Sequence, residues 1–75
     1  MIKRLDMLAS GEAGRVFAVK TAGGMRRRIM DMGITKGANV ECVGISPLGD
    51  PKAYCIRGAV VAIRKEDASA IDIEV

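Results

Sequence analysis

Side chains that could bind a metal ion are few in this 75-residue sequence. It has no histidine, and its thiols are limited to Cys42 and Cys55. A structural zinc site takes about four ligands drawn from cysteine and histidine, so two thiols without an imidazole fall short of one. We expect two reduced, unpaired cysteines, with Cys42 facing inward and Cys55 outward, and neither a metal site nor a cofactor.

Groups that could catalyse a reaction are equally sparse. The hydroxyls of Ser10, Thr21, Thr35 and Ser46 lie in expected turns or connections, with no base nearby to activate them. The Gly23-Gly24 pair lacks the lysine and hydroxyl that complete a phosphate-binding loop, and no other stretch supplies that pattern. The sequence therefore predicts a protein that is not an enzyme and does not hydrolyse nucleotides.

The one dense basic cluster is Arg26-Arg27-Arg28, in a chain whose formal net charge is only +3. Such a cluster can be a solvated helix face, a docking site for an acidic protein or anionic membrane, or a nucleic-acid contact. RNA-binding domains usually add stacking aromatic residues to their basic patch, and this chain has only Phe17 and Tyr54. The same shortage disfavours a groove for proline-rich peptides. We rank nucleic acid last and expect no nucleic-acid partner.

The elements that must position these residues begin with a short helix over Met25–Met32. Met25, Ile29 and Met32 recur at helical spacing and share one face. Gly33 fits the left-handed position that ends a helix, with an apolar contact from the next residue, Ile34, back to Ile29. Gly37 is expected at the positive-φ corner of the turn that follows.

Short apolar segments separated by turns indicate strands around this helix. Leu5 and Leu8 are expected to form a short turn that plugs one end, and residues 66–70 a single helical turn before the closing strand. The strands are expected over residues 15–20, 39–46, 52–57, 59–65 and 71–75. About five short strands with one short inserted helix predict a mainly β protein, a small SH3-like β-barrel formed by a single domain over residues 1–75.

The order and spacing of several segments resemble the ferrous iron transport protein A (FeoA) family. The resemblance runs from about Leu5 to Val75. It is carried by Arg28-Ile29-Met30-Asp31-Met32-Gly33-Ile34-Thr35-Lys36-Gly37, Ser46-Pro47-Leu48-Gly49-Asp50-Pro51, Ile56-Arg57-Gly58, Ile63-Arg64-Lys65-Glu66-Asp67-Ala68 and Ile71-Asp72-Ile73-Glu74-Val75.

This resemblance implies a small cytoplasmic accessory protein of bacterial ferrous iron uptake, acting by protein–protein contact with FeoB, the membrane transporter that carries a GTPase domain. Self-association stays open. Two alternatives remain: the SH3-like domain of a metal-dependent transcriptional repressor and an RNA-binding barrel. Against the first, the sequence shows no helix pair that could read DNA.

No membrane insertion is expected, since the longest uninterrupted apolar run is Ala59–Ile63 and a spanning helix needs about 20 such residues. For the partner surface, the first candidate is the tip of the loop over residues 46–51. There Leu48 lies between two prolines that stiffen the chain. The rival surface is the basic cluster, through Arg26 and Arg27.

Overall fold

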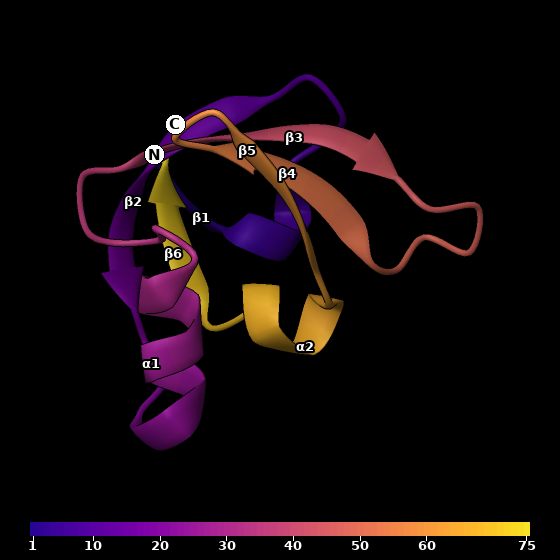
Figure 1. Ribbon diagram of the computed structural model, residues 1–75. Coiled ribbons are helices and arrows are strands. Elements are labelled where there is room, and N and C mark those ends of the chain that lie inside the picture. Colours follow the sequence, from indigo (N-terminus) through magenta and orange to yellow (C-terminus); the bar gives the residue numbers. More distant parts are fainter.

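The computed structural model describes residues 1–75 as one six-stranded antiparallel sheet, strongly curved, with two short α-helices (Figure 1). The strand order is β1-β6-β2-β3-β4-β5. Strands β1 and β5 are the two edges and do not pair with each other, so the barrel is not closed. The elements are β1 (Ile2–Arg4), the 3-10 helix η1 (Leu5–Met7), β2 (Ala13–Val19), α1 (Gly23–Asp31), β3 (Asn39–Ile45), β4 (Lys52–Ile56), β5 (Ala59–Ile63), α2 (Lys65–Ala68) and β6 (Ile71–Glu74).

The core lies inside this curved sheet and is almost entirely aliphatic. Alternate residues of the strands point into it, as period-two geometry requires. Tyr54 of β4 is its one aromatic side chain and is fully buried. The expected plug is confirmed, because η1 and the residue after it bring Leu5 and Leu8 into the core without exposure. The buried hydrophobic residues are Leu5, Leu8, Val16, Ile29, Ile34, Ala38, Val40, Cys42, Tyr54, Ile56, Ile63, Ala68, Ile71 and Ile73.

Helix α1 ends as the sequence predicts. Gly33 has φ +90°, and its N–H donates to the carbonyl oxygen of Met30 at 2.9 Å. The next N–H, of Ile34, reaches back to the carbonyl oxygen of Ile29 at 3.3 Å. Together these bonds form a Schellman motif, and both isoleucine side chains are fully buried. Gly37 also adopts the expected positive φ, +89°, before the chain enters β3.

Several features differ from the sequence-based expectation, and one is that α1 begins at Gly23, two residues before Met25. A sixth strand is present, because Ile2–Arg4 pairs with β6. As a result β6 is a central strand between β1 and β2, instead of a closing edge. Asp72 is only 8% exposed, because neighbouring strands flank it on both sides. Lys20 balances its charge with an ion pair of 2.8 Å.

Neither helix is long and apolar enough to cross a membrane.

Candidate docking surfaces

A groove of about 260 Å³ runs between α1 and β2 and combines apolar with basic side chains. Phe17 of β2 and Met30 of α1 stand on its walls and are both substantially exposed. The buried side chain of Ile34 also lines it. Arg26 and Lys36 supply positive charge, and no acidic side chain lines the groove. An apolar surface with a cationic border is suited to contact a protein that presents acidic residues around an apolar anchor.

Phe17 faces this groove because of an irregularity in β2. Val16 lies opposite Ile73 and Ala18 lies opposite Asp72, so Phe17 has no partner on β6. A bulge of this kind places an extra residue in one strand and redirects its side chain. Phe17 is 47% exposed, whereas the other aromatic residue of the chain is in the core. The sequence does not reveal that Phe17 is exposed, since the bulge arises only from the pairing with β6.

The two arginines that the sequence singled out on α1 play different parts. The guanidinium of Arg26 donates to the carbonyl oxygen of Val19 at 2.9 Å, with a longer contact to that of Thr21 at 3.5 Å. It therefore fastens the start of the helix to the end of β2. Arg27 is exposed and takes part in none of the three ion pairs of the structure. A second hollow continues the groove across the helix and is lined by Gly23, Arg26, Arg27, Met30 and the acidic Asp31. We call the surface formed by Phe17, Arg26, Arg27 and Met30 the helix groove.

The other sequence candidate, Leu48, lies at the tip of the β3–β4 connection and is 93% exposed. Hydrogen bonds close the loop, from Ser46 N–H to the Pro51 carbonyl at 3.3 Å and from Gly49 N–H to the Ser46 carbonyl at 2.8 Å. Figure 1 shows this tip on the opposite side of the molecule from α1. The two candidates are therefore separate surfaces and do not combine into one site.

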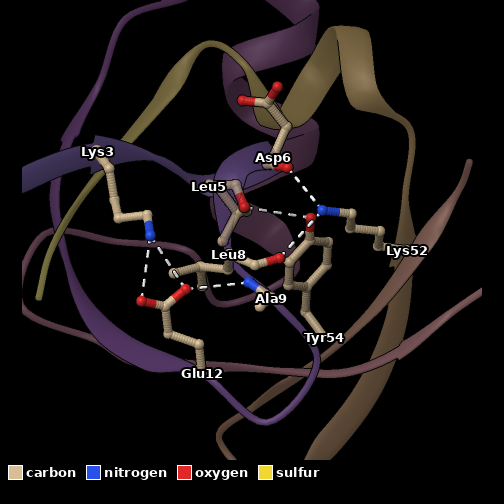
Figure 2. Close-up of polar contacts among 8 residues, drawn as sticks. All are labelled: Lys3, Leu5, Asp6, Leu8, Ala9, Glu12, Lys52 and Tyr54. Atoms are coloured by element: carbon tan, nitrogen blue, oxygen red, sulfur yellow. Dashed lines mark hydrogen bonds and ion pairs between the residues drawn. The ribbon is translucent and has the colours of Figure 1, made fainter. Parts of the chain in front are cut away.

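A polar network fastens the N-terminal plug, and its acceptors are backbone carbonyls of residues 5–8 (Figure 2). The Lys52 ammonium donates to the carbonyl oxygens of Asp6 at 2.7 Å and Leu8 at 3.0 Å. The Tyr54 hydroxyl donates to the Leu5 carbonyl at 3.4 Å, and burial raises the pKa of this phenol above its usual value. Because these donors are used by backbone groups, the network has a structural role.

The same region contains an ion pair that links β1 to the start of β2. The Lys3 ammonium donates to both carboxylate oxygens of Glu12 at 3.1 Å (Figure 2). One of these oxygens also accepts the Ala9 N–H at 3.0 Å. The backbone hydrogen bond from Ala9, followed by the bond from Lys3, lowers the pKa of Glu12.

The cysteines are placed as expected, and both are free. Cys42 is fully buried in the core, and Cys55 is partly exposed on the outer face of β4. The structure contains no group of three or more histidine, cysteine, aspartate or glutamate residues placed to hold a metal ion.

A small, curved antiparallel sheet with an inserted helix and a plugged end defines an SH3-like β domain. The crystal structure of FeoA from Stenotrophomonas maltophilia, described as a prokaryotic SH3 domain protein, shares this fold with a TM-score of 0.85. It is 22% identical over 96% of this chain and 89% of that one. The family model for the FeoA domain matches residues 3–75, and the chain belongs to the FeoA family.

Two further relatives agree with this assignment. The NMR structure of a FeoA-like protein from Clostridium acetobutylicum is 35% identical, with a TM-score of 0.88, over 96% of this chain and 84% of that one. A fusion of Fe(2+) transport protein A with the Fe(2+) transporter FeoB in Porphyromonas gingivalis is 37% identical over 71 residues. This match spans 95% of the chain but only 8% of the fusion protein.

A manganese-dependent transcriptional repressor also has this fold in part of its chain, with a TM-score of 0.85. At 20% identity over 40% of that chain, the likeness is one of fold alone.

Proposed function

We propose that this protein is an accessory factor of bacterial ferrous iron uptake that acts by direct contact with the cytoplasmic side of the membrane transporter FeoB. The observation that carries this proposal is the Porphyromonas gingivalis fusion, in which a segment 37% identical to this chain is covalently joined to the transporter. Fusion of two domains in one chain keeps each at a high effective concentration near the other. Such an arrangement is expected for two domains that bind each other. The chain contributes binding to this process and no catalysis of its own.

The helix groove is the surface we propose for this contact. It joins an exposed aromatic and an exposed methionine to arginines, the residue types that are enriched at the centres of interfaces. Arg27 is available to pair with a carboxylate of the transporter, because it forms no ion pair within this chain, although Asp31 lies one helical turn away and lines the same hollow. Contact there would shift the transporter between states only as far as the affinities for those states differ.

The tip at Leu48 is the second candidate, on the strength of its 93% exposure in a closed loop. A stiff loop with a projecting leucine loses little conformational freedom on binding. It carries no arginine, so binding through the tip would respond weakly to salt. Salt dependence therefore separates the two surfaces.

The test measures binding of this protein to purified transporter in lipid nanodiscs at low and high salt. Phe17→Ser and Arg27→Glu are expected to weaken binding by about tenfold or more each. Arg64→Glu is the matched control, since it makes the same charge change at an exposed residue directly after β5 that does not line the helix groove. Arg26 is left unchanged, because its loss would also release the start of α1.

If only Leu48→Ser weakens binding, and salt has little effect, the tip is the contact and the helix groove is not. If no complex forms with the transporter at any salt concentration, the proposed function itself is wrong.

A further inference from the structure

The free edge of β5 differs in character from the other free edge of the sheet. β1 carries Lys3 and Arg4, and charged residues of this kind protect an edge from pairing with another chain. β5 reads Ala-Val-Val-Ala-Ile and contains no charge and no proline. Its side chains are open to solvent at Ala59, Val60 and Ala62, and Val60 is 66% exposed. β5 is the last strand in the sheet order, and it pairs with β4 alone. An uncharged, exposed edge is the type of strand that accepts a further strand.

The hydrogen-bonding phase of β5 leaves defined backbone groups unpaired. Arg57 and Gly58 form a two-residue turn with φ of 51° and 83°. In such a hairpin the two flanking residues, Ile56 of β4 and Ala59 of β5, exchange both backbone hydrogen bonds with each other. Alternation along the strand then directs the N–H and C=O groups of Val60 and Ala62 away from β4. No backbone hydrogen bond joins β5 to any segment other than β4. These two residues therefore offer two donors and two acceptors at the free edge.

We propose that this edge pairs with the same edge of a second copy of the chain, antiparallel, about a two-fold axis at Val61. In this register Val60 of one copy lies opposite Ala62 of the other, and Ala59 lies opposite Ile63. About four backbone hydrogen bonds form between the copies. Every pair within the strand is apolar, so the sequence is complementary to itself. The inference concerns self-association and is independent of the proposed contact with the transporter.

The size and charge of this interface set its strength. A five-residue strand is about 17 Å long, and its edge buries much less than the roughly 1,200 Å² of a stable interface. The register also brings Lys65 of each copy close to Arg57 of the other, and like charges placed opposite each other oppose pairing. We therefore expect a weak, reversible dimer, which salt strengthens by screening this repulsion. Docking through the helix groove has the opposite salt dependence.

The experiment combines sedimentation equilibrium with amide hydrogen exchange by NMR, on the protein alone, from about 10 μM to about 1 mM, the range in which weak association is measurable. The average mass is expected to rise with concentration and with salt. The Val60 and Ala62 amides should exchange freely at low concentration and become protected at high concentration. The Val61 and Ile63 amides, which bond to β4, should be protected throughout.

Two variants test the edge itself. Ala62→Pro removes a donor that points away from β4, so the strand is retained while two symmetry-related hydrogen bonds of the dimer are lost. Its dissociation constant should rise about tenfold or more. Val60→Lys should act likewise, by placing a charge on the edge. Val43→Lys is the matched control, since Val43 is also exposed but lies on β3, two strands from the edge. The spectra of all three variants report whether the fold is intact.

A mass that stays monomeric across the whole range, or association that neither edge variant weakens, would overturn the proposal. So would protection of Val60 and Ala62 that appears only on addition of the transporter, because the occupant of the edge would then be a different chain.

Discussion

Replacement of Gly33 by alanine tests how the end of α1 is built. Gly33 has φ +90°, in the region where an L-residue brings its Cβ too close to the backbone. Left-handed backbone costs a residue with a Cβ about 1–2 kcal/mol. Alanine also reduces the freedom of the unfolded chain, which returns about 0.4–1 kcal/mol. The strain, less this entropy gain, predicts that the free energy of unfolding falls by about 1 kcal/mol.

The surroundings of Gly33 add to this cost. A Cβ at this position would lie 3.1 Å from Cδ of Arg57 and 3.5 Å from Cγ2 of Ile56. The arginine side chain would have to shift, which weakens its contacts to the Gly33 carbonyl at 3.4 Å and the Thr35 hydroxyl at 3.2 Å. Exposed bonds of this length contribute little, so we expect a total destabilisation of about 1.5 kcal/mol.

Gly37 is the matched control, with a nearly identical φ of +89° and no atom within 4 Å of its added Cβ. Gly37→Ala should therefore lose only the net backbone contribution, about 1 kcal/mol, without any effect of neighbouring side chains. Urea melts measure both losses, and the midpoint of thermal unfolding should fall by about 4–8 °C per kcal/mol in a domain of this size. When Gly33→Ala is made in a protein that already carries Arg57→Ala, the additional loss of stability should be close to that of Gly37→Ala. A neutral Gly33→Ala would refute the assigned helix end, and equal costs at both glycines would refute the role of Arg57.

Three further predictions concern the N-terminal plug. Lys52→Met leaves the carbonyls of Asp6 and Leu8 without their donor, and should cost about 2 kcal/mol in urea melts, whereas Lys52→Arg should recover part of the loss. Glu12 has a lowered pKa in the folded state, so its contribution to stability is complete above its pKa of 4.5 in the unfolded chain and declines as pH falls through the lower folded pKa. The stability of Glu12→Gln should therefore fall less steeply at acid pH than that of the parent. Burial raises the pKa of Tyr54, so the folded state keeps its proton where the unfolded state releases it. Stability should therefore fall as the pH rises above 10.0, the ordinary pKa of tyrosine, and phenolate absorbance should appear together with unfolding.

The sequence alone determined those features that depend on local chemistry. The glycine after a helical apolar stripe was enough to place the end of α1, because a left-handed residue and its apolar contact are encoded within a few positions. The inward face of β4 followed from the alternation of Tyr54 and Ile56 with Cys55, since a strand has a period of two residues. The segments in order also identified the FeoA family, which its domain model confirms over residues 3–75.

Only the tertiary structure decided the features that depend on pairing between distant segments. Strand β1 is three residues long and carries two charges, so its pattern is too weak to reveal a strand until β6 lies beside it. That pairing makes β6 central and buries Asp72. The bulge that exposes Phe17 arises from the register between β2 and β6, and the free edge of β5 from a sheet that does not close. Local sequence sets the faces of each strand, but the identity of its neighbours is fixed only when the whole sheet assembles.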